Sequence, residues 1–247
     1  MNSLHLYRCD LLDTLSIEEC GAYIEKHYPK VSLSAVNWPS VAPYQPLCIV
    51  TGAYSEKYIY IHFVSREYGL RAVNTENLSP VADDSCVEFF VRTAPGKEYW
   101  NFEFNCIGAV NGSHRILRPD ATRLTHEEIE SIKRHSSCGT VPFGEKEGIH
   151  TWTLTAAIPR ELIGLEKGNY LSHVFGNFYK CAGKAMNRHY LSWAPIKSEK
   201  PNFHFREYFR HIYFDLWLWA GERVSTTYSD DVPIRNLPPQ MPMPELI

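Results

Sequence analysis

The sequence predicts an all-β protein, an antiparallel β-sandwich with one or two short helices and an extended C-terminal tail. Its strongest signal is the alternation of apolar and polar residues with period two, which is typical of half-buried strands. Strand patterns bounded by turn residues lie at residues 46–53, 57–64, 84–92, 99–106, 149–158, 169–180 and 209–216. Because strands and helices do not alternate along the chain, the sequence favours a sandwich over a parallel sheet.

The clearest hairpin is formed by residues 84–92 and 99–106, which flank the turn signal Ala94-Pro95-Gly96-Lys97. A loop centred on the Pro-Gly pair places Glu88 opposite Glu103 on one face. On the other face it makes three apolar pairs, namely Val87 with Phe104, Phe89 with Phe102 and Val91 with Trp100. Burial of each large apolar side chain stabilises the fold by roughly 1.5–3 kcal/mol, so we expect that face to lie in the core.

The polar face of the hairpin carries side chains that are uncommon in strands, namely Glu88, Asn101, Glu103 and Asn105. Two carboxylates directly opposite each other repel unless a cation, a shared proton or a hydrogen-bonding ligand compensates for their charge. The pattern therefore favours a binding site on this face. The alternative is that both glutamates point into bulk water or pair with neighbouring Lys and Arg side chains.

Two short helices are expected beside the strands. Residues 14–28 form the first, although Gly21 weakens its helical pattern. The second begins near Thr125, because Thr125 and Glu128 make a capping box. Both helices decorate the sandwich rather than forming a layer of their own.

The composition excludes several classes of partner. The 247 residues are 44% hydrophobic and 21% charged, with a formal net charge of -3. Because Lys and Arg are scattered without a basic stripe, nucleic acid is not an expected partner. No apolar run approaches the roughly 20 residues of a membrane span, so no membrane partner is expected either. The chain as written starts without a leader pattern, so the expected location is cytoplasmic, or secreted or periplasmic if the precursor starts upstream.

The cysteines predict reduced thiols. The chain has 7 of them, an odd number, and no C-x-x-C spacing occurs. This pattern disfavours both a disulfide framework and a zinc knuckle.

Four segments together resemble the bacterial family 9-like carbohydrate-binding modules. They are DDSCVEFFV at 83–91, YWNFEFNCIG at 99–108, RHYLSWAPI at 188–196 and PNFHFREYFRHIYF at 201–214. The resemblance implies a jelly-roll-like sandwich that binds oligosaccharides or glycan ends in polysaccharide catabolism. It also implies that the module performs no catalysis and requires no cofactor, although relatives often hold structural calcium.

The resemblance runs from about residue 31 to residue 216 and so divides the chain into three parts. Residues 1–30 are expected to be an N-terminal extension with helical character, and residues 31–216 the family 9-like sandwich. Residues 217–247 are a C-terminal extension. Its last stretch, 233–247, contains five prolines, which excludes a central strand.

The resemblance assigns roles to three residues by motif. Glu88 matches an acidic residue that hydrogen-bonds sugar hydroxyls, Arg188 lies near a basic ligand contact, and Phe203 lies near an aromatic platform. Amide side chains both donate and accept hydrogen bonds, which suits the edge of a sugar ring. The expected ligand-binding set is therefore Glu88, Asn101, Glu103, Asn105, Arg188 and Phe203.

Two departures from the family pattern concern the aromatic walls of such a site. Members that clamp a sugar between two rings place an aromatic residue just before the Asp-Ser-x-x-Glu run. This chain has Val81 and Ala82 there. Phe203 also stands where those members have a larger indole, which reduces the stacking area.

Calcium is the metal that the resemblance implies. Hard cations prefer carboxylates and carbonyls, so Asp83 and Asp84 are the ligands we expect. Chelation should then lower the melting temperature, because removing an ion that binds only the folded state destabilises that state. An unchanged melting temperature would contradict a stabilising calcium site.

Two other functions remain as alternatives. A glycoside hydrolase could use Glu88 and Glu103, because opposed strand positions approach the roughly 5–5.5 Å carboxyl separation of retaining enzymes. An interaction scaffold could have lost sugar binding and could recruit a partner through its tail. Val81-Ala82 and the unusual C-terminus favour the second alternative.

The C-terminal extension gives a prediction that proteolysis can test. In DLWLWAG at 215–221, a continued strand would place Trp217 and Trp219 on one face, where they could bury much apolar area. We expect 217–221 to pack on its own sandwich or on another copy as a homodimer, and 233–247 to form no regular sheet. Limited proteolysis should cut near residue 233 and leave both tryptophans protected, whereas trimming back to Asp215 at unchanged stability would contradict this.

Overall fold

The computed structural model describes residues 3–93, 98–165, 168 and 171–216. The strands are β1 Leu4–Arg8, β2 Lys30–Ser32, β3 Ala35–Val36, β4 Leu47–Tyr54, β5 Tyr58–Ala72, β6 Cys86–Arg92, β7 Tyr99–Asn105, β8 Val110–Arg115, β9 Ala121–Arg123, β10 Lys133–Ser136, β11 Phe143–Pro159, β12 His173–Ala182, β13 His189–Ser192 and β14 Arg210–Asp215. The helices are α1 Ile17–His27 and α2 His126–Ser131, with 3-10 turns η1 Asp10–Thr14, η2 Val81–Asp83, η3 Glu161–Ile163 and η4 Arg206–Tyr208.

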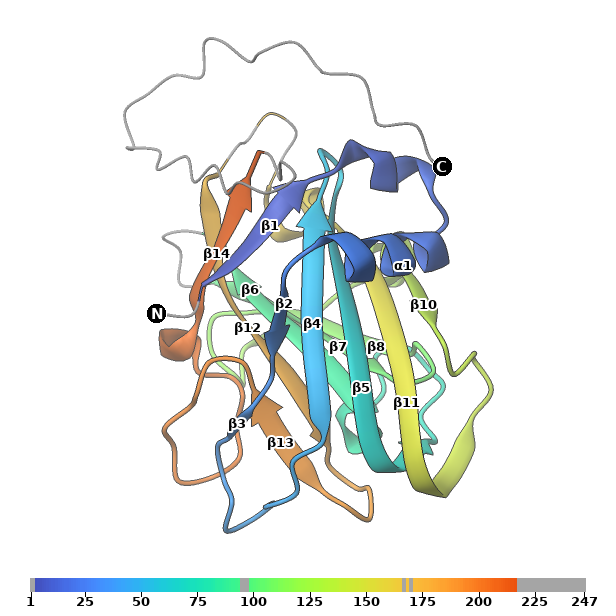
Figure 1. The fold of residues 1–247 in the computed structure, drawn as a ribbon. Coiled ribbons are helices and arrows are strands. Elements are labelled where there is room, and N and C mark those ends of the chain that lie inside the picture. The colour runs from blue at the N-terminus through green and yellow to red at the C-terminus, as the bar shows by residue number, and fades with distance from the viewer. Residues whose placement is uncertain (1–2, 94–97, 166–167, 169–170, 217–247) are drawn as a thin grey trace.

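These strands form a two-layered β-sandwich, which confirms the predicted fold class (Figure 1). The strands β4, β5 and β11 lie in one layer, and β6, β7, β8 and β12 cross behind them in the other. The strand order is β10-β11-β5-β4-β1-β14-β12-β6-β7-β8-β9. The two layers are therefore halves of one continuous sheet that folds over on itself through β1 and β14.

The N-terminal residues supply both the expected helix and an unexpected strand. β1 pairs in parallel with β4 and with β14, whereas the other pairings within the described residues are antiparallel. α1 begins after Ser16, whose side chain forms a capping box with Glu19. Its buried residues Cys20 and Ile24 pack against Tyr60 on the outer face of the β4–β5–β11 layer.

The hairpin β6–β7 has the register that the sequence predicts. Glu88 lies opposite Glu103 and Phe89 opposite Phe102, and the remaining pairs also agree. The turn residues 94–97 on which that prediction was centred lie outside the described residues. The second predicted capping box, Thr125 with Glu128, is also present at the start of α2.

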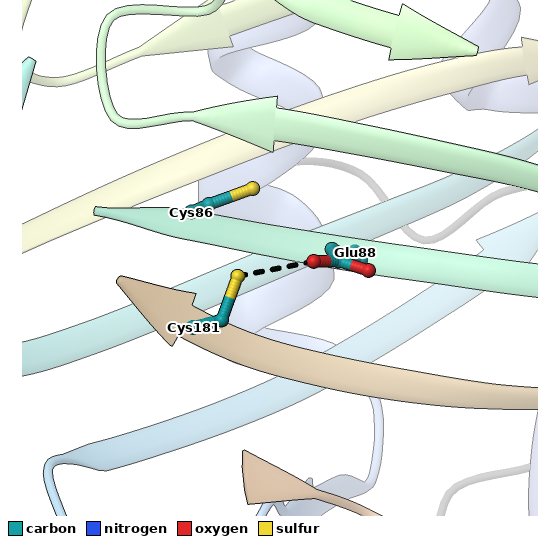
Figure 2. A group of neighbouring side chains, drawn as sticks. All are labelled: Cys86, Glu88 and Cys181. Atoms are coloured by element: carbon teal, nitrogen blue, oxygen red, sulfur yellow. Dashed lines mark hydrogen bonds between the residues drawn. The ribbon is translucent and has the colours of Figure 1, made fainter. Parts of the chain in front are cut away.

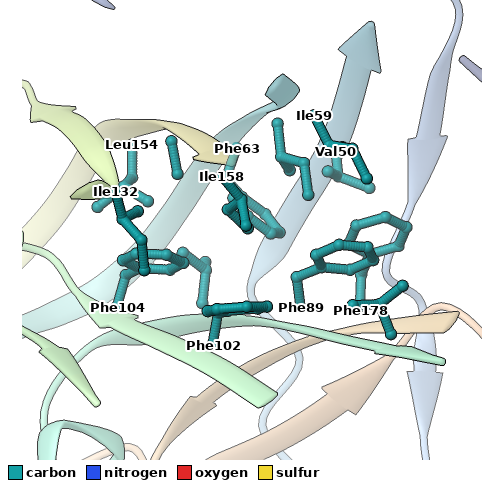
Figure 3. Close-up of a cluster of buried hydrophobic side chains, with 14 of the residues drawn as sticks. Val50, Ile59, Phe63, Phe89, Phe102, Phe104, Ile132, Leu154, Ile158 and Phe178 are labelled. Atoms are coloured by element: carbon teal, nitrogen blue, oxygen red, sulfur yellow. The ribbon is translucent and has the colours of Figure 1, made fainter. Parts of the chain in front are cut away.

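The apolar face of this hairpin forms the core with the opposite layer (Figure 3). Phe89, Phe102 and Phe104 are each at most 1% exposed. They face side chains of β4, β5 and β11, among them Phe63 and Leu154. Phe89 also stacks on Phe178 of the neighbouring β12, with ring centroids 4.8 Å apart. The alternation of side chains thus commits one whole face of β6 and β7 to the interior.

A buried ion pair connects the two layers. Lys180 on β12 and Glu67 on β5 are both almost completely buried, and the Lys180 ammonium lies 3.1 Å from each Glu67 carboxylate oxygen. Trp152 Nε1 donates to Glu67 Oε1 at 2.6 Å, and Ser85 Oγ donates to Oε2 at 3.2 Å. Because a buried charge without a partner is costly, these contacts fix where β12 lies over β5.

His189 completes this cluster as a neutral side chain. Burial lowers its pKa well below the ordinary value, and the neighbouring Lys180 charge lowers it further. The Lys180 ammonium can only donate, so His189 Nε2 accepts its hydrogen bond at 2.8 Å. The other ring nitrogen, Nδ1, therefore carries the proton and donates to the Asn187 carbonyl at 2.8 Å.

No helix in the described part of the chain is long and apolar enough to span a membrane. The predictions for Trp217, Trp219, the proline-rich 233–247 and a homodimer all concern residues outside those described.

Replacing Lys180 with Met should destabilise the fold strongly. The substitution leaves the Glu67 carboxylate buried without its counter-ion, which costs about 3–5 kcal/mol. As a matched control, Lys184→Met removes an exposed lysine that pairs with Asp83 at 2.8 Å, and it should cost no more than about 1 kcal/mol. Urea unfolding measures both values, and adding Glu67→Gln to Lys180→Met should recover part of the loss. Equal effects of the two lysine substitutions would contradict the argument.

Candidate functional site

The polar face of the hairpin forms the floor of a cavity of about 280 Å³ on the outside of the sandwich. Strands and loops from distant parts of the sequence line it, namely Ala82, Glu88, Glu103, Arg118, Cys181, Tyr190, Pro201, Asn202, Phe203 and His204. Two larger hollows, of about 470 and 490 Å³, lie around Arg134 and around His62. Only the smaller cavity, among these three, combines both opposed carboxyl groups with aromatic side chains, and we take it as the candidate site.

Glu103 is held in place by two amides. Its side chain accepts hydrogen bonds from Asn101 Nδ2 at 2.9 Å and from Asn111 Nδ2 at 3.0 Å, one on each oxygen. Arg115 Nε in turn donates to Asn101 Oδ1 at 2.7 Å, which orients that amide. The carboxyl group of Glu103 is therefore preorganised at the cavity wall.

Glu88 is neutralised rather than paired with a cation. It is 2% exposed, and the Cys181 thiol donates to its Oε1 at 3.0 Å. Burial raises the pKa of Glu88 well above its ordinary value, and the facing Glu103 carboxylate raises it further. Burial also raises the pKa of Glu103, but the hydrogen bond from Asn111 and the Arg115 charge oppose that rise. Of the two facing carboxyl groups, Glu88 is thus the one that keeps a proton.

Aromatic side chains form one side of the cavity. Phe203 lies flat on Tyr179, with ring centroids 4.2 Å apart and planes 12° from parallel. It is only 9% exposed, so it is both a core residue and a part of the cavity wall. Tyr190, which is half-buried, adds a second ring. At the two positions where the sequence lacks the expected aromatic residue, Val81 is fully buried and Ala82 reaches the wall.

His204 is a neutral hydrogen-bonding group at the cavity. Burial, together with the charges of Arg115 and Arg118, lowers its pKa to about 3. Its Nδ1 lies 3.0 Å from the Tyr99 hydroxyl. Near neutral pH the cavity therefore presents an arginine and a neutral imidazole beside the two glutamates.

The structure places the other three predicted ligand contacts away from the cavity wall. Asn101 is completely buried between Glu103 and Arg115. Asn105 is also completely buried, and its amide caps a turn by accepting from the Ile107 and Ala109 N–H groups. Arg188 is exposed and lies outside the residues that line the cavity. Asn105 thus supports a turn and Asn101 orients Glu103, and ligand contact by Asn101, Asn105 and Arg188 stays a prediction.

The two aspartates predicted to bind calcium have basic or N–H neighbours. Asp84 is completely buried, and its Oδ2 accepts hydrogen bonds from Val73 N, Asn74 N, Asn74 Nδ2 and Asn105 Nδ2. Its Oδ1 lies 3.4 Å from Arg71 Nε, and Asp83 pairs with Lys184. A calcium ion needs several oxygen ligands, whereas this surrounding supplies donors and cations. These neighbours disfavour the ion, and calcium binding by Asp83 and Asp84 stays a prediction.

Comparison with known proteins gives the family. The sequence matches the model of carbohydrate-binding family 9 over residues 22–214. The chain belongs to carbohydrate-binding family 9. A search of curated proteins finds no match.

Solved structures agree with this family 9 assignment. A candidate carbohydrate-binding protein from Bacteroides uniformis is 30% identical and superposes with a TM-score of 0.81, covering 87% of this chain and 99% of its own. A family 9 module from Caldicellulosiruptor kristjanssonii, in complex with cellotriose, is 10% identical with a TM-score of 0.52, covering 94% and 100%. The second comparison supports the fold alone. Family membership makes this chain a noncatalytic carbohydrate-binding protein.

Several lining residues of this family 9 chain escaped the sequence analysis. Arg118 follows β8 in a loop, and no local pattern marks it. The sequence could have indicated Tyr190 and His204, because each lies within two residues of a residue that the motifs singled out. Tyr190 has the same strand parity as Arg188, and His204 directly follows Phe203. An aromatic ring on the ligand-facing side of a strand was the available signal.

Replacing Glu88 with Gln should stabilise the protein increasingly as the pH rises. Because the folded-state pKa of Glu88 lies above its ordinary value of 4.5, its stabilising contribution is complete below that value and is lost as the pH rises through the folded pKa. Glutamine cannot ionise and so avoids that loss. Between about pH 5 and about pH 9 the melting-temperature difference, variant minus parent, should grow by at least about 2–4 °C, the effect of 1 kcal/mol in a domain of this size. A difference that does not change with pH would contradict the buried, protonated state.

Proposed function

We propose that the cavity over β6 and β7 binds the terminal sugar unit of an oligosaccharide or a glycan end. The observation that carries this proposal is the convergence of Glu88 and Glu103 with the rings of Phe203 and Tyr190 on one small cavity. Sugar sites combine polar groups for the hydroxyls with an apolar ring for the face of the pyranose. A cavity of about 280 Å³ suits one end of a chain better than its middle.

The polar groups have complementary roles in this proposal. Glu103, whose oxygens are oriented by Asn101 and Asn111, accepts hydrogen bonds from sugar hydroxyls. Protonated Glu88 can donate as well as accept, and Arg118 only donates. A ligand that lacks one of the matching hydroxyls would leave buried polar groups unpaired, so discrimination between sugars should be strong.

The physiological setting that we propose is polysaccharide catabolism. The Caldicellulosiruptor kristjanssonii relative was solved with cellotriose, so β-linked glucose oligomers are the first ligands to try. Because Ala82 stands where a second aromatic wall would be, the sugar stacks on one side only. We therefore expect affinity to depend more on hydrogen bonds than on stacking.

Glu103→Gln tests the proposal directly. The amide keeps the size of the carboxyl group but replaces one hydrogen-bond acceptor by a donor, so calorimetric titration with cello-oligosaccharides should show at least about a tenfold loss of affinity, about 1.4 kcal/mol. Glu127→Gln, an identical change at an exposed helix position, should leave affinity unchanged. Circular dichroism controls for folding. Absence of binding by the parent across a broad glycan panel would instead favour an interaction scaffold.

A glycoside hydrolase is the alternative against which the noncatalytic assignment is tested, because Glu88 faces Glu103 and the two carboxyl groups differ in environment. In a retaining hydrolase both groups take part in the reaction. Hydrolysis of a bound oligosaccharide by the parent, lost in Glu88→Gln, would support that candidate. Binding without hydrolysis supports the noncatalytic function of the family.

A further inference from the structure

Three metal-ligating side chains, Cys86, Glu88 and Cys181, meet beneath the cavity wall (Figure 2), and the last two of them line the cavity. Cys86 and Glu88 lie two residues apart on β6 and so point to the same face, and Cys181 is the direct partner of Cys86 on β12. Their ligand atoms all lie within 4.8 Å of one another. Among the described residues, no other group of three His, Cys, Asp or Glu side chains meets this criterion.

We propose that Cys86, Glu88 and Cys181 bind a divalent transition-metal cation of the zinc class. Thiolates select soft or borderline metals over calcium. A tetrahedral zinc ion, with bonds of about 2.3 Å to sulfur and about 2.0 Å to oxygen, needs ligand atoms roughly 3.5–3.8 Å apart. Cys181 Sγ and Glu88 Oε1 are now 3.0 Å apart, so side-chain adjustments of less than about 1 Å make room for the ion.

The position of the three ligands gives the ion both a route and an open coordination site. Cys86, Glu88 and Cys181 are 0%, 2% and 1% exposed, so the thiols are shielded from bulk solvent. Glu88 and Cys181 nevertheless line the cavity, through which an ion can enter. Three protein ligands leave the fourth tetrahedral position of the metal free.

The charges around the site suit an exchange of protons for a metal ion. Burial raises the pKa of Cys86 to about 12, and the hydrogen bond with Cys86 together with burial raises that of Cys181 further. Each ligand therefore releases a proton to solvent when the metal binds. Two thiolates and one carboxylate give three negative charges against the two positive charges of the ion. Lys180 lowers the pKa of all three groups and so favours their ionised forms.

Cobalt(II) titration without sugar tests this site independently of carbohydrate binding. Protein without a histidine tag, kept reduced by a phosphine, should bind one cobalt ion per chain and show the intense sulfur-to-cobalt absorption of thiolate ligation. Zinc should displace the cobalt, whereas calcium in excess should not. The titration should also release protons, which calorimetry in two buffers of different ionisation enthalpy measures.

Single substitutions assign the ligands. Cys86→Ala and Cys181→Ala should each abolish tight binding and the one-to-one stoichiometry. Glu88→Gln should keep the thiolate absorption and weaken affinity by at least the roughly 10- to 100-fold that loss of an outer-shell partner costs. Cys106→Ala is the matched control, because Cys106 and Cys138 form a second pair of neighbouring thiols. It should leave the cobalt absorption intact.

Three outcomes would overturn the proposal. They are a folded, reduced parent without the thiolate absorption, an absorption that survives both Cys86→Ala and Cys181→Ala, and loss of the absorption in Cys106→Ala alone. Melting curves show whether each alanine variant folds. If the Cys86→Ala or the Cys181→Ala variant does not fold, the assignment depends on Glu88→Gln, which preserves side-chain size. Unchanged cobalt affinity in that variant then overturns the proposal.

Discussion

The opposite orientation of successive side chains in β6 and β7 is the constraint on which the core and the cavity both depend. Phe89 and Phe102 point inward and stack the two layers together, while Glu88 and Glu103, one position away, point outward to the cavity floor. A slip of one residue in the pairing would exchange these faces and bury both carboxyl groups in the core. The apolar packing that stabilises the sandwich therefore also fixes the position of the site.

The two faces of strand β12 bury ionisable groups in different ways. Lys180 points inward, where the interior offers the fixed carboxylate of Glu67, and a paired charge is tolerable there. Cys181 points outward to Glu88, which meets a thiol instead of a cation and keeps its proton. Because the ion pair of Lys180 and Glu67 joins the two layers, a change in their relative position would be costly. The protonated Glu88 on the outer face keeps hydrogen-bonding capacity for a ligand.

Local patterns in the sequence predicted the parts of the structure that depend on neighbouring residues. The hairpin pairing, its apolar face and the capping box at Thr125 follow from strand parity and from the three-residue spacing of Thr125 and Glu128, and all are confirmed. The parallel pairing of β1 did not follow, because it joins segments about 200 residues apart and no turn specifies it. The polar face likewise predicted where the cavity lies but not its full lining. Arg118 and His204 reach it from loops whose course depends on tertiary packing.

Asn105 shows that a polar residue on the same side of a strand as the cavity can also serve the backbone. Strand parity places it on the same side as Glu103, but β7 ends at Asn105, and the chain must turn there toward β8. The Ile107 and Ala109 N–H groups lie inside that turn, where water cannot satisfy them, and the side-chain oxygen Oδ1 of Asn105 accepts from both. Parity identifies the side of the sheet, whereas position along the strand decides whether a polar group serves a ligand or the backbone. The middle of the strand, at Glu103, is where the site can form.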